Sequence, residues 1–219
     1  MCIRDRFGAW VQQIGIATVK NKFNDAVAAG VGAITNTTTA TLDKRGTTAS
    51  EDNTINADML LQAAALMGDH FEDIRTWLMH SQSWFKFARN NLKDYQRLFN
   101  YRGVTVMEDT LGNQFIITDD NSLQFSHQSQ VKYRTLGLLE GAIKVYDDGE
   151  MYNNIDTRNR TRIQTTLKTE SRFALRVRGY SFGTQKYPTI AQLQTSTAWT
   201  KTANTDNADG PGVALLHQV

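Results

Sequence analysis

The amino-acid sequence predicts an α+β protein. Three observations lead to this prediction: a long helical pattern near the N-terminus, a helix–strand–helix nucleus at residues 57–92, and a strongly alternating strand at residues 163–179. The chain has 219 residues, of which 40% are hydrophobic and 21% are charged. These proportions are typical of a globular protein and favour a sizeable hydrophobic core.

The first predicted element is one long helix at residues 7–34. Apolar residues recur every three or four positions: Ile16, Val19, Phe23, Val27, Val31 and Ile34. A helix of about 28 residues extends ~42 Å, which suits an elongated subunit. Because glycine lowers helix propensity, two shorter helices with a kink at Gly30 are the alternative.

The segments on either side of this helix differ from it in character. Residues 1–6, MCIRDR, fit no element, and we interpret them as a non-native leader joined to a truncated reading frame. Residues 35–56 are rich in Thr, Asn, Asp and Ser and predict a surface loop.

The nucleus at residues 57–92 has the densest apolar content. Asp58 is the expected N-cap of its first helix, and Gly68 stands where that helix needs a left-handed C′ residue. Residues 74–79 predict a short buried strand, and Ser81 or Ser83 is the expected cap of a second helix. We expect three aromatic residues to stabilise this nucleus: Trp77, Trp84 and Phe85.

The rest of the chain is mostly strand. Residues 103–120 predict a hairpin around a turn at residues 111–113, and residues 133–146 predict an apolar segment that ends at a turn at residues 147–149. Beyond Pro188 we expect a short helical or looped segment, an acidic loop at residues 204–211, and a closing strand that contains Val213, Leu215 and Leu216.

The strand at residues 163–179 has apolar residues at one parity and charged residues at the other. The charged parity contains Arg172, Arg176 and Arg178. Such a row can meet phosphates, but a solvated face or a row of ion pairs between subunits fits the pattern better. We therefore predict these three arginines as subunit-interface residues.

Overall charge and cysteine content exclude several classes of protein. The balance of 24 basic and 22 acidic residues gives a net charge of +2, which is too weak to indicate a nucleic-acid or membrane partner. The single cysteine, Cys2, excludes a disulfide within the chain. No apolar run approaches the ~20 residues needed to span a bilayer, and no signal peptide is evident.

One cluster resembles metal ligands: Asp69, His70, Glu72, Asp73 and His80. Its spacing matches no zinc-binding pattern, and helix capping and solvated charge account for the acidic residues. Ser81 follows His80, but it lacks the glycines of a nucleophile elbow. We therefore expect no catalytic, cofactor-binding or metal-binding residue, and no enzyme.

Order and spacing of several segments resemble the major capsid proteins of tailed bacteriophages. The run LLQAAALMGDHFEDIRTWLMHSQSWFKFARNNL resembles their axial-domain segment, with the helix end at Gly68-Asp69 and the "MHS" strand end at residues 79–81. Similar matches are FGAWVQQIGIATVKNKFNDAV, YRTLGLLEGAIKVYDD, TIAQLQTSTAWTKTA and GVALLHQV.

This resemblance implies the Hong Kong 97-type capsid fold. Residues 7–56 would form the spine helix and a loop of the peripheral domain, and residues 57–154 the axial domain. Residues 155–219 would return to the peripheral domain with long strands and the C-terminal strand. The N-terminal arm and extended loop of that fold are expected before Phe7.

The resemblance also implies a function. The chain would assemble with itself into pentamers and hexamers of an icosahedral shell around double-stranded DNA, with a scaffolding protein and a portal as further partners. It would reside in the virion after assembly in the host cytoplasm. The alternatives are an encapsulin-like nanocompartment shell, a metal-dependent hydrolase around Asp69, His70 and His80, and a nucleic-acid-binding module.

Overall fold

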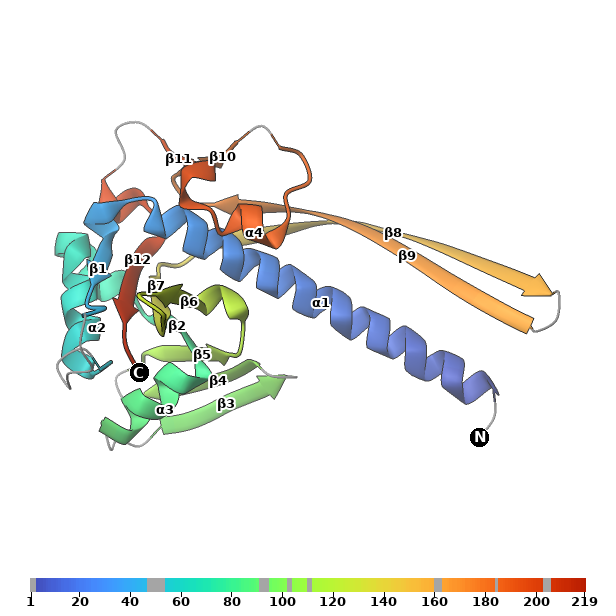
Figure 1. Cartoon of the computed structure of the whole chain (residues 1–219), viewed down its shortest axis with the longest axis horizontal. Helices are drawn as coiled ribbons and strands as arrows, with labels where there is room; N and C mark the ends of the chain where they lie inside the picture. Colours follow the sequence, from blue (N-terminus) through green and yellow to red (C-terminus); the bar gives the residue numbers. More distant parts are fainter. Residues whose placement is uncertain are drawn as a thin grey trace.

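The computed structural model describes residues 3–46, 54–90, 95–101, 104–109, 112–159, 163–183, 185–202 and 206–219. A mixed eight-stranded sheet has helices on both of its faces, and a long helix and a long hairpin extend away from it (Figure 1). This mixture of helices and strands agrees with the predicted α+β class.

The helices are α1 (Ile3–Thr35), η1 (Thr38–Ala40), α2 (Ala57–Ala64), η3 (Ala65–Asp73), α3 (Ser81–Asn90), η4 (Asn121–Leu123), α4 (Ile190–Leu193), η5 (Ser196–Ala198) and η6 (Asn207–Asp209). The strands are β1 (Thr41–Asp43), β2 (Thr76–His80), β3 (Tyr95–Tyr101), β4 (Val104–Asp109), β5 (Gln114–Thr118), β6 (Gln124–His127), β7 (Gln130–Leu138), β8 (Ile143–Asn159), β9 (Ile163–Val177), β10 (Tyr180–Phe182), β11 (Trp199–Lys201) and β12 (Gly212–His217).

The main sheet has the strand order β1-β12-β7-β2-β5-β4-β3, and β6 pairs with residues 130–133 at the start of β7. Strand β12 is buried along its whole length, which confirms the predicted closing strand. It runs parallel to β1 and antiparallel to β7, so it lies inside the sheet although it comes last in the chain. Strands from both segments of the predicted peripheral domain and from the predicted axial domain thus share one sheet.

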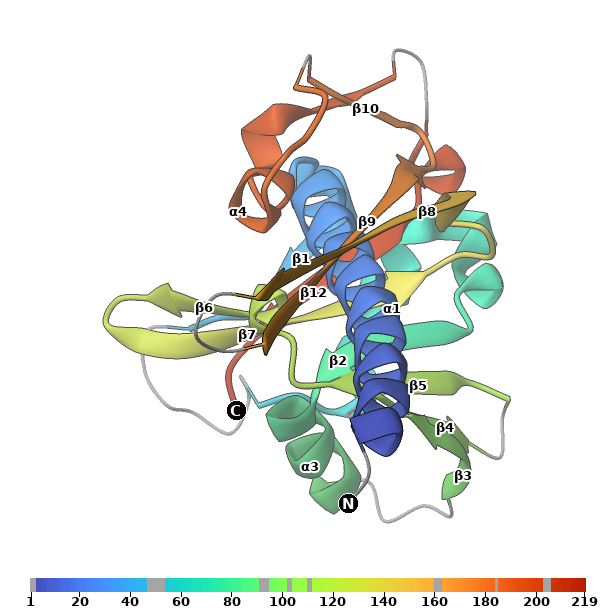
Figure 2. The same cartoon turned by 90° about the vertical axis from the view of Figure 1, so that its right-hand side faces the viewer.

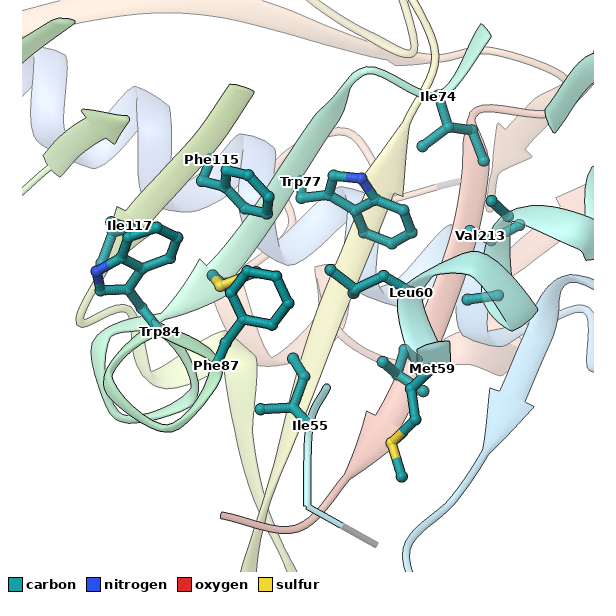
Figure 3. Packing of buried hydrophobic residues seen from close by; sticks show 14 of the residues in the cluster. Ile55, Met59, Leu60, Ile74, Trp77, Trp84, Phe87, Phe115, Ile117 and Val213 are labelled. Atoms are coloured by element: carbon teal, nitrogen blue, oxygen red, sulfur yellow. The ribbon is translucent and has the colours of Figure 1, made fainter. Parts of the chain in front are cut away.

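The two faces of the sheet bury different elements because alternate side chains of a strand point to opposite sides. Trp77, Phe115 and Val213 pack against α2, η3 and α3 on one face (Figure 3). Leu136 and Ala214 pack against α1 on the other face. Strand β2 contributes to both faces, and its burial confirms the strand predicted at residues 74–79.

Helix α1 is continuous, so the prediction of one long helix is confirmed and the alternative kink at Gly30 is wrong. It begins at Ile3, and residues 3–6, which were predicted to fit no element, are helical. At Gly30 and Gly32 an added Cβ would lie 2.7 Å from the Ile143 side chain and 2.0 Å from the Leu193 carbonyl oxygen, respectively. Gly32 is therefore required for close packing, which outweighs its low helix propensity, whereas at Gly30 the end of the Ile143 side chain can move aside.

A second layer covers the other side of this helix. Ala29 and Ala33 of α1 pack with Val177, Leu193 and Trp199, and the Trp199 indole donates a hydrogen bond to the Leu193 carbonyl at 2.8 Å. Figure 2 shows α1 passing between the main sheet and the layer that contains α4 and β10. The inner end of α1 is therefore enclosed from both sides.

The helix caps of the nucleus differ from the prediction. Asn56, with an extended backbone, caps α2 by accepting the Met59 N–H at 2.8 Å, so the assignment of Asp58 is wrong. Helix α3 begins at Ser81, and the His80 imidazole accepts the Gln82 N–H at 3.2 Å. Neither predicted serine caps α3: the Ser81 hydroxyl donates to Asp119, and Ser83 Oγ is buried without a hydrogen-bond partner.

The aromatic predictions for this nucleus hold for two of the three residues. Trp77 and Trp84 are buried, and the Trp84 ring lies 5.3 Å from the Phe115 ring. Phe85 is 67% exposed, so its predicted role in folding is wrong. The helix turns this side chain away from the sheet, whereas Phe87 is buried. Gly68 has a positive φ of 61°, but its ψ of −128° is not that of a left-handed C′ residue, and it lies within η3 and not at the end of α2.

Two predicted loops and turns are partly ordered into strands. Within the predicted loop at residues 35–56, β1 pairs with β12 and Ile55 is buried, while residues 47–53 lie outside the described part. The turn predicted to end a strand at residues 147–149 is instead a bulge, and β8 continues to Asn159. Gly149, with φ of 72°, permits that bulge. The hairpin of β4 and β5 is confirmed, whereas Leu111 of its predicted turn is not described.

Candidate subunit interface

Two elements extend away from the main sheet toward the same end of the molecule (Figure 1). They are the N-terminal part of α1 and the hairpin of β8 and β9, which pair only with each other among the described strands. Residues 12–26 of α1 are exposed or half-buried, whereas residues 27–34 are buried. Both projecting elements thus have a large surface that the described residues of the chain leave uncovered.

One polar contact joins the two projecting elements. Lys22 of α1 forms an ion pair with Asp147 of β8, and its ammonium lies 5.7 Å from the centre of the Phe173 ring. The hydrogen bond from Lys22 lowers the pKa of Asp147 below its ordinary value. Because this carboxylate is exposed, solvent screens the attraction, and the pair orients the hairpin more than it stabilises the fold.

The hairpin has two faces of different character, which confirms the alternation predicted for residues 163–179. Leu175 and Val177 of β9 pack toward α1. The alternate residues of β9, at even-numbered positions, point away from α1 and are exposed. Their partners in β8 lie on the same side, because residues paired across antiparallel strands share a face. We call this exposed side the outer face, and its described residues are Lys144, Tyr146, Tyr152, Asn154, Thr166, Lys168, Glu170, Arg172, Ala174 and Arg176.

The predicted interface arginines fall on or beside this face. Arg172 and Arg176 belong to the outer face, and the Arg172 guanidinium lies 5.8 Å from the centre of the Tyr152 ring. Arg178 is exposed just beyond the strand, where its N–H donates to the Ala142 carbonyl at 2.9 Å. Their contact with another subunit stays a prediction.

Sequence reasoning missed the residues that β8 contributes to the outer face. Lys144, Tyr146 and Tyr152 lie opposite Arg176, Ala174 and Glu170, respectively. The alternation of residues 143–146 is a usable signal for the first two. The polar residues 147–150 then interrupt the pattern before Tyr152, which hides the third.

A groove follows the inner side of the hairpin. One part has a volume of about 830 Å³ and lies among α1, the hairpin and the segment that leads to α4, with Leu175, Leu193 and Trp199 in its wall. A second part of about 600 Å³ is lined by Lys22 and by Arg172, which borders this groove as well as the outer face. Asp25 borders both parts, and burial together with the nearby Asp120 raises its pKa. The groove offers an apolar floor with charged edges.

The candidate metal ligands do not converge. His70 Nδ1 lies 2.9 Å from Asp73 Oδ2 on exposed η3, whereas His80 ends β2 and its ring lies 5.1 Å from that of Tyr133. Within the described ranges, no group of three or more His, Cys, Asp or Glu side chains is placed to hold a metal ion. The proposed ligand set of Asp69, His70 and His80 therefore has no geometric support.

The neighbouring serine is also poorly placed for catalysis. The Ser81 hydroxyl donates to the Asp119 carboxylate, and the His80 Nε2 atom lies 3.9 Å from the same carboxylate. A catalytic base must accept the proton of the nucleophile. Here the serine proton is directed to the carboxylate, while His80 Nδ1 is occupied by the Gln82 N–H. Burial lowers the pKa of His80, against the smaller opposing effect of Asp119.

In the part of the chain that the structure describes, none of the helices is long and apolar enough to cross a membrane. Even α1, with 33 residues, does not meet both conditions.

The chain matches the model of a known protein family. The model of the major capsid protein 13-like family, Gp13-like, matches residues 7–214, which extend from the projecting part of α1 into β12. No curated protein matches the chain. Since the family match covers nearly the whole chain, the chain belongs to the major capsid protein 13-like (Gp13-like) family.

Proposed function

We propose that this chain is the shell-forming subunit of a tailed bacteriophage. Its copies join into pentamers and hexamers of an icosahedral shell that encloses double-stranded DNA. Membership in a major capsid protein family supports this proposal. The subunit resides in the virion after assembly in the host cytoplasm, and a scaffolding protein and a portal are its further partners.

We also propose the Hong Kong 97-type arrangement for this subunit. In it, α1 is the spine helix, residues 57–154 form the axial domain, and residues 155–219 return to the peripheral domain. The length of α1, at 33 residues, and the long β8–β9 hairpin beside it support this assignment.

The observation that carries the proposal is the uncovered surface of the two projecting elements. An isolated two-stranded hairpin is marginally stable in water at best, and this one lacks a third strand among the described residues. Its outer tyrosines, Tyr146 and Tyr152, are 50% and 53% exposed, and Val19 of the neighbouring helix is 54% exposed. Contact with further copies would bury these surfaces and stabilise both elements.

Assembly of the purified chain tests the proposal. We expect negative-stain electron microscopy to show closed shells, or rings of five and six subunits, and sedimentation velocity to show mass well above the 24.7 kDa monomer. Nuclease-protected DNA inside particles from expressing cells is the expected cargo. A monomer at every concentration contradicts self-assembly, and particles that enclose protein instead of DNA contradict the phage role.

A further inference from the structure

We propose that the outer face of the β8–β9 hairpin docks on an acidic surface of a second copy of this chain. That acidic surface is formed by η3 and η6, and its residues are Asp69, Glu72, Asp73, Asp206 and Asp209. The inference rests on the proposed self-assembly and adds to it the two surfaces that meet.

The outer face has the composition of a protein-binding surface. Four of its side chains are basic and one, Glu170, is acidic, and its two tyrosines are about half exposed. Tyrosine and arginine are enriched at protein interfaces because they combine apolar area with hydrogen-bonding groups. The ring of Tyr152 also supports the Arg172 guanidinium by a cation–π contact, which limits its conformational freedom before binding.

The acidic surface is held together by contacts between its two segments. Asn207 of η6 donates hydrogen bonds to the Leu66 carbonyl at 3.2 Å and to the Thr39 carbonyl at 3.1 Å. All five acidic side chains are exposed. Phe71, 47% exposed, lies within η3 and adds apolar area among the charges.

The charges of the two surfaces are complementary. From residue 54 to residue 79, Arg75 is the single lysine or arginine, against four acidic residues. Arginine forms bidentate hydrogen bonds with carboxylates, so Arg172 and Arg176 suit Glu72 and Asp73 as partners.

The distal part of the outer face can reach an acidic surface only on another copy. The base of the hairpin, in contrast, lies beside η6 of its own chain, where an added Cβ at Gly179 would lie 3.1 Å from the Asp209 carbonyl oxygen. Helix α2, which leads directly into η3, lies at one end of the long axis, and the hairpin extends toward the other end (Figure 1). A hairpin therefore meets the acidic surface of a neighbour. Because the two surfaces differ, the contact is head-to-tail and generates rings when the rotation closes.

A second copy fits the outer face better than DNA does. Glu170 stands between Lys168 and Arg172 on the same face, where it would repel a phosphate backbone. The acidic surface of a second copy also carries His70 and Arg75, and these basic side chains accommodate the negative charge of Glu170. The net charge of +2 also gives the chain little general attraction for nucleic acid.

A charge exchange between two variants tests this docking. One variant carries Arg172→Glu and Arg176→Glu, and the other carries Glu72→Lys and Asp73→Lys. Each variant alone should lose about tenfold or more of the assembled mass measured by sedimentation velocity, since like charges then face each other. A 1:1 mixture should recover assembly into rings with an even number of subunits, such as hexamers, in which the two variants alternate. Each altered surface then meets its altered partner and each unaltered surface meets an unaltered one, whereas a ring of five cannot close by alternation.

The controls separate docking from folding and from the proposed function. Lys86→Glu with Arg89→Glu makes the same change of charge on α3, across the sheet from the hairpin, and should keep assembly within about twofold. If a variant loses the circular dichroism of the unaltered chain, a neutral pair takes its place. The neutral pairs are Arg172→Gln with Arg176→Gln, and Glu72→Gln with Asp73→Gln. Loss of assembly by both neutral pairs then supports the docking, and retained assembly overturns it.

The remaining outcomes are decisive. If folded variants assemble no better together than alone while the unaltered chain assembles, the docking is wrong and the proposed function stands. If the arginine variant forms shells that have lost only their DNA, the outer face contacts DNA instead. If the unaltered chain never assembles, both proposals fall.

Discussion

The two ends of α1 lie in different environments, although they belong to one uninterrupted helix. Residues 27–34 are buried between the main sheet and the second layer, and residues 12–26 are exposed or half-buried beside the hairpin. We call these the inner and outer segments. The comparison shows that tertiary packing stabilises the inner segment, whereas the outer segment receives from its own chain mainly helix propensity and the contact of Lys22 with the hairpin.

The same glycine-to-alanine change should have opposite effects on the two segments. Gly32→Ala places a Cβ 2.0 Å from the Leu193 carbonyl oxygen, so backbone has to move. We expect the free energy of unfolding to fall by about 3 kcal/mol or more, measured by urea denaturation.

Gly15→Ala is the matched control, because an added Cβ there meets no atom within 4 Å. Alanine should raise stability by about 0.5–1 kcal/mol through its helix propensity. Equal effects at the two positions would contradict the division into inner and outer segments.

Acid should weaken the sheet that encloses the inner segment before it affects the outer contact. His217 of β12 is fully buried, and burial lowers its pKa to about 4 from the ordinary 6.5. The Gln218 carbonyl accepts from Nδ1 at 3.1 Å, which leaves Nε2 to accept the Thr135 hydroxyl at 3.0 Å. Because the unfolded chain binds this proton more readily, stability is complete above pH 6.5 and is lost as pH falls toward 4.

The expected loss over this interval is about 3 kcal/mol, from the 1.36 kcal/mol that corresponds to each pKa unit. Urea denaturation at pH 7, 5.5 and 4.5 measures it, and His217→Gln should flatten the dependence. The Lys22–Asp147 pair should persist to lower pH, because the pKa of Asp147 is below its ordinary 3.8. An equally steep loss in the His217→Gln variant would contradict this assignment.

Valine truncation compares burial along the helix directly. Val31 is completely buried against the sheet, and Val31→Ala should cost about 2 kcal/mol in chemical denaturation. Val19 is 54% exposed, and Val19→Ala should change monomer stability by less than about 0.5 kcal/mol. A large loss at Val19 in the monomer would show that the outer segment is packed within its own chain.

The smallest effect is expected at the contact between α1 and the hairpin. Lys22→Met removes the charge and retains most of the aliphatic chain over Phe173. We expect faster amide hydrogen exchange in β8 and β9 with an unchanged melting temperature, because the exposed pair orients the hairpin. Lys20→Met, an exposed position on the same helix, is the control. Unchanged exchange in the hairpin would show that Lys22 does not hold it.

The elements with strong local patterns could be predicted from the sequence. Helical spacing identified α1, strict alternation identified β9, and an apolar run identified β12. The arginines of the outer face were predicted from that alternation. The tyrosines of β8 were not, because the polar residues at 147–149 indicate a turn, and only the pairing with β9 shows that the strand continues through a bulge to Tyr152.

By itself, the sequence determined the long helix, the strand alternation and the family resemblance, because periodicity and composition are local properties of the chain. Only the tertiary structure decided that Asn56 caps α2, that Phe85 is exposed, and that His70 and His80 have separate partners. It also explains Gly32: glycine lowers helix propensity, but a Cβ at this position would clash with the Leu193 carbonyl oxygen. The physical reason is that these features depend on contacts between segments far apart in the chain, which local propensity does not encode.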